Sequence, residues 1–569
     1  MSPRLITPEL QQRHGNLGRL LGLTGGVIVV LSALLPWAYG DEALDRMTFL
    51  LNPSPLQYMG LLLGLLVVGA LLGARRFTPK RGRPTADWTK AAKAGATGVL
   101  IFVAIILVAI ATELGGLVNV VYGGWVALVG ALLASLGTRL IPTGPEATLY
   151  RAKTKSWLEL ASIVVLMAAV LFGTAFALDD DDGGSFISFV AFVGTVLAVL
   201  FGLGVMGWMS VVSQRHKQVL ILSAFVVAFL FPFTQDGSDA NMSIATQVII
   251  FAAAAMGLNI VVGLAGLLDL GYIAFLGAGA FVAAILSRSA FSTLDFHPPF
   301  IVTVLISGLV SATLGLIIGT PTLRVSGDYL AIVTLAFGEI FRITMINLDG
   351  EAGPDLTNGS NGIPAIPDLN LFGFNFGKPH ELLGIPLGRF SNYYWLLLLV
   401  IGLIILVFTR LNNSRIGRGW VAIREDEKAA EAMGVNVFGL KLFAFAGGAF
   451  LAGVAGSVKA HQDISVTPDQ YVFLQSAFLL AAIVLGGMGT VLGVLVGATL
   501  LILLPEKLRF VSDLRLWLFG LLLVLMMRFR PEGLIASKRR QLEFHDDDEE
   551  LAERIEDQIQ PSGMKGVTS

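Results

Sequence analysis

Cysteine is absent from this 569-residue chain, and charged residues are scarce. Without cysteine, the chain can form no disulfide, no thiolate metal site and no cysteine nucleophile. Charged residues make up 14% of the chain, whereas a soluble domain of average composition carries about 25%. The formal net charge is −2, so there is no broad basic surface for nucleic acid, and we expect no nucleic-acid partner.

Long apolar runs take the place of the missing charge. Hydrophobic residues form 55% of the chain, and the mean hydropathy is +0.76. Apolar runs recur at about the 20-residue length that a helix needs to cross a hydrocarbon core, and the alternation of a membrane β-barrel is missing. The sequence therefore predicts an all-α polytopic membrane protein. We expect about sixteen spans, some of them glycine-broken half-helices, at 20–38, 57–74, 95–112, 117–137, 157–178, 185–208, 218–233, 244–265, 272–287, 299–319, 328–347, 392–409, 442–459, 473–486, 491–505 and 513–527.

The first apolar run, Leu20 to Trp37, follows Arg4, Arg13 and Arg19. It is longer than the apolar core of a typical signal peptide, which is about 7–15 residues. We therefore predict a first span that is retained in the membrane. Cleavage after Gly40 is the alternative.

Loop charge predicts which side of the membrane each loop occupies, because basic loops stay in the cytoplasm. The basic and acidic loops alternate as consecutive loops should, and continuing the count places 410–441 and both termini in the cytoplasm. The long segment 348–391 falls outside, where it is either a docking site for an external protein or a passive loop. The loops that establish the count are basic at 75–84, 151–155 and 214–217 and acidic at 179–184 and 234–242.

Polarity divides the chain into three regions. Residues 1–215 hold six spans with little internal polarity, residues 216–535 hold ten spans with more glycine and polar residues, and residues 536–569 form a charged cytoplasmic tail. Within the second region, 256–286 and 477–504 each read as an apolar helix, a glycine-bearing break and a further apolar helix. Such paired, interrupted segments mark the transport path in repeat-built transporters.

No sequence motif for nucleotide or metal chemistry stands in a suitable context. The chain has no G-x-x-x-x-G-K-[ST], and its G-x-G-x-x-G match at 202–207 lies inside an apolar span rather than between a strand and a helix. The histidines are scattered, so we expect no metal site and no catalytic residue. The G-x-x-x-G spacings Gly60/Gly64 and Gly69/Gly73 predict close helix packing instead.

Charged residues inside apolar helices are costly and are therefore candidate functional residues. Glu339 and Arg342 lie three residues apart in the apolar segment 329–347, so they share one helix face. We predict that they pair and face the interior of the helix bundle. They belong either to the transport path or to an ion pair that fixes helix packing. Asp269, near the inner end of its span, is expected to cap the following helix.

The segment AIREDEKAAEAMG, residues 422–434, is densely charged, although it lies between apolar helices. We predict one short cytoplasmic helix with Ala422, Ala429 and Met433 along one side, ended by Gly434 in the left-handed conformation. A lipid-binding helix would be rich in Lys, Arg and bulky apolar residues, whereas acids and alanine dominate here. The expected binding site is therefore a groove on a partner protein.

Six motifs, in order through 216–535, resemble the membrane permease subunit of bacterial branched-chain amino-acid ABC importers. The resemblance implies a ten-span importer core similar to that of vitamin B12-type permeases, in the bacterial plasma (inner) membrane. About six extra spans in 1–215 precede that core and are not covered. The motifs are GLNIVVGLAGLLDLGY (257–272), GDYLAIVTLAFGEIFRI (327–343), NGSNGI (358–363), GRGWVAIREDEKAAEAMGVN (417–436), AIVLGGMGT (482–490) and RPEGL (530–534).

The resemblance also implies partners: a second permease subunit, two cytoplasmic ATPase subunits and an extracytoplasmic substrate-binding protein, besides the lipid bilayer. ATP and Mg would be used by the ATPases, and no cofactor would be bound by this chain. The segment 422–434 resembles the coupling segment that sits in a cleft of the ATPase, although Lys428 interrupts its E-A-A pattern. The implied coupling residues are Arg424, Glu425, Glu427, Ala429, Ala430, Glu431 and Gly434. The candidates for the translocation path or its framework are Gly263, Gly266, Asp269, Tyr272, Asp328, Tyr329, Glu339, Arg342, Gly486, Gly487 and Gly489.

The function implied by the resemblance is ATP-driven import of branched-chain or other apolar amino acids. Close relatives of this family serve urea and short amides, which remain an alternative. An ion-coupled secondary transporter is the alternative of another class. It would need more buried carboxylates than the sequence offers, and it leaves the charged segment unexplained. A scaffold without transport leaves the paired glycine breaks unexplained.

Overall fold

The computed structural model describes most of the chain. The predicted tail 536–569, Asp328 and parts of the charged loops lie outside the described residues. Those described are 8–39, 47, 50–76, 84–142, 147–152, 154–179, 183–322, 329–351, 353–382, 384–507, 515–529 and 533–535.

Helices dominate this part of the chain, and each predicted span coincides with one of them. Eleven helices in the described part are long and apolar enough to cross a membrane. The other five predicted spans are helices of 13 to 18 residues. At about 1.5 Å of rise per residue, the shorter of them do not reach across a hydrocarbon core of about 30 Å. The predicted all-α polytopic membrane fold is confirmed.

The chain forms two compact units, of which the first comprises Met1–Asp236 with Glu506–Ser512. This unit includes the span at 218–233, although the change in polarity at residue 215 assigned that span to the second region. Its helices are α1 (Pro8–Ser32), α2 (Pro55–Arg76), α3 (Trp88–Glu113), α4 (Tyr122–Arg139), α5 (Ser156–Asp179), α6 (Gly183–Leu203), α7 (Val205–Arg215) and α8 (Lys217–Leu230), with the short turns η1 (Leu117–Asn119), η2 (Leu149–Arg151) and η3 (Phe231–Gln235).

Small residues let the helices of the first unit approach closely. A Cβ placed on Gly25 of α1 would overlap the backbone of Ala134 in α4, and one on Gly64 of α2 would lie 2.8 Å from Val30 of α1. Close approach of backbones is the expected use of small residues between membrane helices. A Cβ placed on Gly69 would meet no atom of another segment within 4 Å, so the packing role predicted for it is wrong.

The second unit comprises Gly237–Pro505 with Asp513–Ser569. Its helical elements are α9 (Asp239–Leu258), the π-helical η4 (Asn259–Leu264), α10 (Ile273–Ile285), α11 (Phe300–Thr322), α12 (Tyr329–Asn347), η5 (Gly359–Asn361), α13 (Arg389–Asn412), α14 (Arg415–Glu425), α15 (Glu427–Ala432), α16 (Val437–Asp463), η6 (Pro468–Tyr471), α17 (Phe473–Gly486), α18 (Val491–Lys507) and α19 (Arg515–Phe529). Its strands are β1 (Asn370–Leu371), β2 (Phe374–Asn375), β3 (His380–Leu382) and β4 (Ile385–Leu387).

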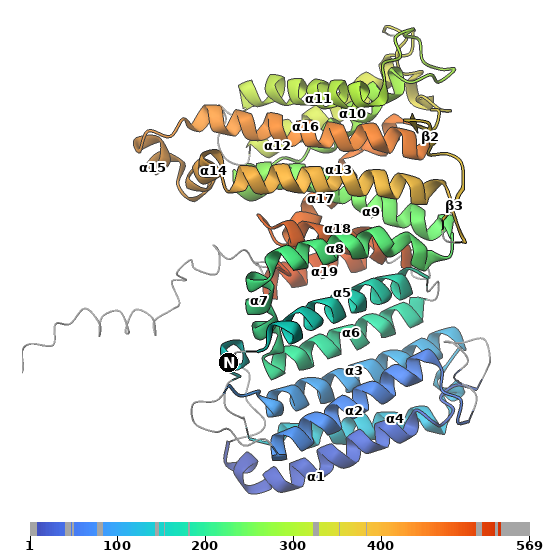
Figure 1. Ribbon diagram of the computed structural model, residues 1–569, viewed down its shortest axis with the longest axis vertical. Helices are drawn as coiled ribbons and strands as arrows, with labels where there is room; N and C mark the ends of the chain where they lie inside the picture. The colour runs from blue at the N-terminus through green and yellow to red at the C-terminus, as the bar shows by residue number, and fades with distance from the viewer. Residues whose placement is uncertain are drawn as a thin grey trace, which may run out of the picture. The chain divides into compact units, whose positions relative to one another are not determined.

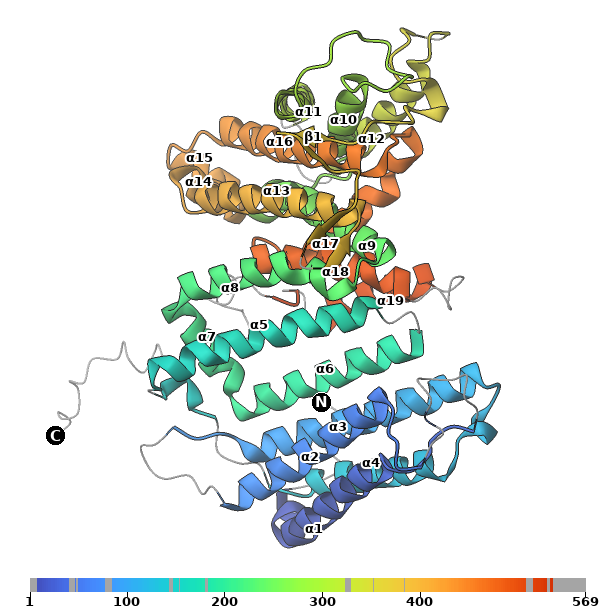
Figure 2. The same ribbon diagram turned by 45° about the vertical axis from the view of Figure 1, so that its right-hand side comes forward.

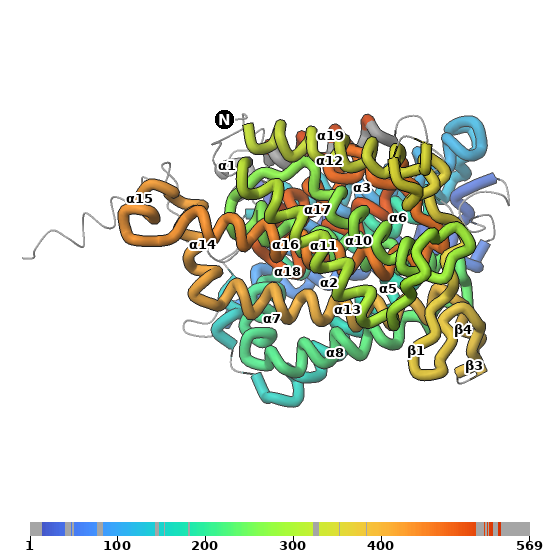
Figure 3. Tube along the Cα trace, turned by 90° about the horizontal axis from the view of Figure 1, so that it is seen from above, coloured from blue at the N-terminus to red at the C-terminus, as the bar shows by residue number. Residues whose placement is uncertain are grey.

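Helix α16 is central to the second unit and packs against α9, α10, α11 and α13 (Figures 1 and 2). Glycine makes this packing close: a Cβ on Gly279 of α10 would overlap the Gly453 backbone of α16, and one on Gly456 would overlap the carbonyl oxygen of Leu276. The antiparallel hairpins β1–β2 and β3–β4 lie at one end of the unit. Helices α14 and α15 project from the opposite end (Figure 3). We call these the hairpin end and the α15 end.

Candidate functional site

The charged segment 422–434 forms the end of α14 and the whole of α15 rather than one helix. Asp426 is extended, with φ −154° and ψ 108°, between the end of α14 and the start of α15. Its carboxylate accepts a hydrogen bond from the Ala429 amide at 3.0 Å, as an N-cap does. The predicted single helix is therefore wrong, because the preference of Asp426 for the cap position breaks it. Ala422 and Met433 do not share one helix face.

Gly434 ends α15 in the left-handed conformation, with φ +82°, as predicted. The Gly434 amide donates to the Glu431 carbonyl at 2.9 Å, and the Val435 amide donates to the Ala430 carbonyl at 3.1 Å. This is the hydrogen-bond pattern of a glycine C-cap. The turn leaves Met433 85% exposed while Ala430 is buried, so the tip of α15 presents an apolar side chain to solvent.

Buried contacts fasten the two short helices to α16. Trp420 of α14 is fully buried, and its indole Nε1 donates to the Leu440 carbonyl at 2.7 Å. Its ring stacks on Phe443, with centroids 6.0 Å apart. Lys441 Nζ lies 2.6 Å from Glu427 Oε1. The α15 end is therefore held to α16 on both sides of the Asp426 cap.

Arg424 connects the charged segment to the first glycine break. Its Nη1 donates to the Gly263 carbonyl at 2.9 Å, and its Nη2 donates to Glu425 at 3.0 Å. Gly266 has φ +72°, and a Cβ there would lie 2.5 Å from Arg424 Cγ. Because a side chain at position 266 would collide with Arg424 and strain the backbone, glycine is required at this contact.

The two predicted glycine breaks meet in space. Asn259 of η4 accepts a hydrogen bond from the Gly489 amide at 2.8 Å, and its Nδ2 lies 3.4 Å from the Thr490 carbonyl. A Cβ on Gly263 would lie 2.7 Å from the Gly489 amide nitrogen. The breaks also leave backbone groups without helical partners. Arg424 donates to the Gly263 carbonyl, and Asn259 accepts from the Gly489 amide.

Residues 533–535 brace the second break. The Leu534 and Ile535 amides donate to the carbonyls of Leu485 and Gly486, each at 2.9 Å. A Cβ on Gly487 would overlap the Ile535 carbonyl oxygen. Of the predicted path glycines, the structure therefore places Gly263, Gly266, Gly486, Gly487 and Gly489 close to one another.

Asp269 and Tyr272 lie just before α10 and are buried. Asp269 Oδ1 accepts a hydrogen bond from the Gly271 amide at 2.9 Å, while Oδ2 is buried with no hydrogen-bond partner among the described residues. The predicted capping of α10 is wrong, because α10 begins at Ile273 and the Asp269 turn closes before it. The Tyr272 hydroxyl donates to the Gly448 carbonyl of α16 at 2.6 Å.

Glu339 and Arg342 pair as predicted, with Arg342 Nε 3.0 Å from Glu339 Oε2. Arg342 Nη1 also lies 3.6 Å from Asp469 Oδ1. The predicted interior position is wrong within this chain, because the Glu339 side chain is 38% exposed and that of Arg342 is 25% exposed. Tyr329, at the start of α12, is also exposed.

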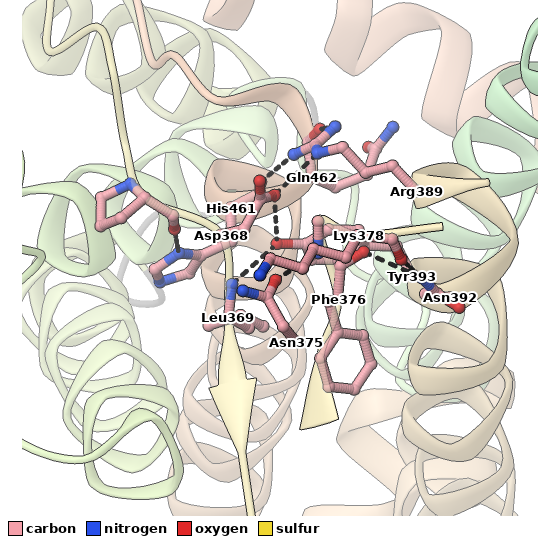
Figure 4. Close-up of polar contacts among 12 residues, drawn as sticks. Asp368, Leu369, Asn375, Phe376, Lys378, Arg389, Asn392, Tyr393, His461 and Gln462 are labelled. Atoms are coloured by element: carbon pink, nitrogen blue, oxygen red, sulfur yellow. Dashed lines mark hydrogen bonds and ion pairs between the residues drawn. The ribbon is translucent and has the colours of Figure 1, made fainter. Parts of the chain in front are cut away.

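A polar cluster at the hairpin end was missed from the sequence (Figure 4). Arg389 Nε lies 2.7 Å from Asp368 Oδ1, and its two Nη atoms donate to the carbonyls of Gln462 and His461, each at 2.7 Å. Tyr393 donates to the same Asp368 oxygen at 3.1 Å. The partners come from distant positions in the chain, so no local pattern pointed to them.

Comparisons with known proteins identify the family of this chain. The family described as branched-chain amino acid transport system / permease component matches residues 241–529, just over half of the chain. The LivM permease protein of the high-affinity branched-chain amino acid transport system of Salmonella typhimurium is 39% identical over 342 residues, which cover 58% of this chain and 77% of that relative. Its Escherichia coli counterpart is 37% identical over the same shares.

A more distant relative is named for the import of a different solute. The ribose import permease protein RbsC of Haemophilus influenzae is 26% identical over 51% of this chain and 83% of that relative. No solved structure gives a significant match. The matched residues hold the two glycine breaks, Arg424 and the α14–α15 projection, and the chain belongs to the family of permease components of branched-chain amino acid transport systems.

Proposed function

We propose that this chain is the membrane permease subunit of an ATP-driven importer of branched-chain amino acids. The observation that carries the proposal is the Arg424 bridge, which joins the exposed α14–α15 projection to the Gly263 carbonyl at the first break. Asn259 continues this connection to the second break. The names of the relatives that are 37–39% identical support the choice of substrate.

The projection is the proposed contact with the partner ATPases. Two cytoplasmic ATPase subunits would bind ATP and Mg, and each permease would insert its α15 tip into one of them. Met433 supplies the exposed apolar contact, and Glu425, Glu427 and Glu431 supply the surrounding charge. A partner's movement at α15 would then reach the glycine breaks through Arg424. The buried Trp420 keeps α14 attached to α16 during this movement.

The partly exposed Glu339–Arg342 pair supports a second permease subunit as a further partner. The pair lies near the middle of α12, where contact with hydrocarbon would be costly. A second permease covering this face of α12 would remove that contact and place the transport path between the two subunits. The bacterial inner membrane, with both termini in the cytoplasm, is the proposed location. An extracytoplasmic binding protein would dock at the hairpin end.

Labelled-leucine uptake by the assembled importer in proteoliposomes tests the proposal. Uptake should require ATP on the side of the vesicle membrane where the ATPases lie. A catalytically inactive ATPase should abolish it. Uptake that persists under a proton gradient with an inactive ATPase would overturn the proposal and favour an ion-coupled transporter. Competition by urea or acetamide, but not by valine, would favour the alternative substrates.

The charged projection has its own test. Glu427→Lys and Gly434→Trp should each abolish co-purification of the ATPase while membrane insertion is unchanged, because they reverse a charge and distort the cap at the proposed contact. Unchanged co-purification for both variants would contradict the assignment of α14–α15 as the ATPase contact.

A further inference from the structure

A cleft of about 440 Å³ opens at the hairpin end of the second unit. Its wall comes from the end of α10, the residues before α11, the segment 367–370 and His461 of α16. Small-molecule sites are commonly about 300–1,000 Å³ in volume. We propose that this cleft binds an α-amino acid zwitterion with an aliphatic side chain, before the solute passes into the membrane. The identity of the ligand rests on the proposed function.

His461 provides an acceptor for the ammonium group of the ligand. Its side chain is buried, and its Nδ1 lies 3.0 Å from the Pro367 carbonyl oxygen. Because a carbonyl oxygen only accepts, Nδ1 carries the proton, and in the neutral ring Nε2 is an acceptor. No described residue donates to Nε2. Phe300 lies edge-on to the ring, with centroids 5.3 Å apart, and holds its orientation.

Asp368 provides the negative charge beside His461 (Figure 4). Its Oδ1 is occupied by Arg389 and Tyr393, whereas its Oδ2 receives no hydrogen bond from the described part of the chain. Arg389 is itself fixed by the carbonyls of His461 and Gln462. The carboxylate is therefore held in place in the wall of the cleft, where its charge would favour an ammonium group that donates to His461 Nε2.

The opposite charge lines the same cleft. Arg288 is exposed and lines the cleft, without an ion-pair or hydrogen-bond partner among the described residues. Helix α11 begins at Phe300, after Pro298 and Pro299, and its first amides carry the partial positive charge of a helix N-terminus. In the proposed complex, the ligand carboxylate lies between Arg288 and the amides of Phe300 and Ile301. Leu286, Ala283 and Phe300 offer the apolar surface for an aliphatic side chain.

Saturation-transfer NMR on the assembled importer in nanodiscs, without the binding protein, tests ligand chemistry. Leucine should bind, while 4-methylpentanoate, which lacks the ammonium, and leucinamide, which lacks the carboxylate, should each bind at least about tenfold more weakly, since each loses a charge-assisted hydrogen bond. Equal binding of all three, or no binding of leucine, would overturn the proposal.

Variants locate the site. Arg288→Ala should weaken leucine binding at least about tenfold and Arg288→Glu should abolish it, whereas Lys378→Ala, which removes an exposed cation outside the cleft, should leave it unchanged. Wild-type affinity in both Arg288 variants would overturn the proposal, as would an effect confined to docking of the binding protein. Leucine binding that depends on Arg288 in an importer that takes up no branched-chain amino acid would support the cleft and contradict the proposed function.

Discussion

Each unit contains a buried carboxylate, and the two differ in how many of their oxygens have hydrogen-bond partners. Glu159 of α5 in the first unit accepts hydrogen bonds from Thr154 at 2.7 Å and Arg215 at 2.5 Å, and His216 lies 2.9 Å from its other oxygen. Asp269 of the second unit accepts a hydrogen bond from the Gly271 amide on one oxygen, while its second oxygen is buried with no hydrogen-bond partner in the part of the chain that the structure describes. The first arrangement is that of a fixed scaffold, because every acceptor is occupied.

The same difference extends to the helices. Glycines of the first unit bring continuous helices together, as between α1 and α4. Glycines of the second unit also pack helices closely around α16, but others lie at the breaks after η4 and α17, where distant side chains such as Arg424 and Asn259 bind the freed backbone groups. Polar contacts of this kind can be exchanged between conformations, whereas close backbone packing cannot be exchanged without unpacking the helices. We therefore expect movement at the breaks of the second unit rather than in its close-packed core around α16 or in the first unit.

The largest effect is expected from adding a side chain at Gly271, beside the first break. A Cβ added by Gly271→Ala would overlap the Thr334 carbonyl oxygen. Overpacking of this kind costs about 1–3 kcal/mol or more, and the neighbouring atom is backbone, so we expect loss of the folded monodisperse protein in size-exclusion chromatography. Gly447→Ala in α16, where the added Cβ would meet no atom of another segment within 4 Å, is the matched control. Equal recovery of both variants would contradict this packing.

Neutralising each buried carboxylate sharpens the comparison directly. Glu159→Gln should lower the melting temperature, because Arg215 and His216 lose their charged partner, and should leave the transport rate per folded molecule unchanged. Asp269→Asn should keep the melting temperature, because Asp269 forms no ion pair with any described residue, and should lower leucine uptake. Thermal unfolding and uptake are measured on both variants. Lower uptake with an unchanged melting temperature in Glu159→Gln, and the opposite in Asp269→Asn, would contradict the division into scaffold and moving part.

Separating the two glycine breaks should have an intermediate effect. Asn259→Leu removes the acceptor for the Gly489 amide, and a lost hydrogen bond with a buried partner costs about 1–3 kcal/mol. We expect a lower melting temperature and uptake reduced about tenfold, as a 1.4 kcal/mol change corresponds to about one factor of ten. Asn413→Leu, which removes an exposed contact to the Thr409 carbonyl, is the control. Matching behaviour of the two variants would argue against coupling between the breaks.

The smallest effect is expected at Gly69 of the first unit. A Cβ there meets no atom within 4 Å, and alanine is favoured over glycine within a helix by about 0.5–1 kcal/mol. Gly69→Ala should therefore leave uptake unchanged and raise the melting temperature slightly. Gly25→Ala, against the backbone of Ala134, should lower it. A loss of uptake in Gly69→Ala would assign the first unit a part in transport.

Hydropathy and glycine spacing were enough to predict the helices, because apolar length and backbone breaks are local properties. The sequence also predicted the left-handed cap at Gly434 and the Glu339–Arg342 pair from residue spacing. It missed the division at Asp426, although aspartate three residues before Ala429 is a capping signal that could have been used. The partial exposure of Glu339 depends on how α12 packs, which the spacing does not contain.

The contacts between distant segments could not be predicted from local sequence patterns. Arg424 reaches Gly263 across 161 positions, and Asn259 reaches Gly489 across 230. His461 lies 94 positions from Pro367. Only the packing around α16 brings these residues together, so the sequence supplied the candidate glycines while the structure supplied their connection.

The ratio of leucine imported to ATP hydrolysed by an Arg424→Ala importer tests the central claim most directly. Arg410→Ala, at the exposed end of α13, is the matched control. The Arg424 bridge predicts an ATPase that still binds and hydrolyses ATP while the leucine imported per ATP falls at least about tenfold, in line with one lost charge-assisted hydrogen bond. An unchanged ratio in Arg424→Ala would contradict the claim that this arginine carries movement from α14–α15 to the glycine breaks.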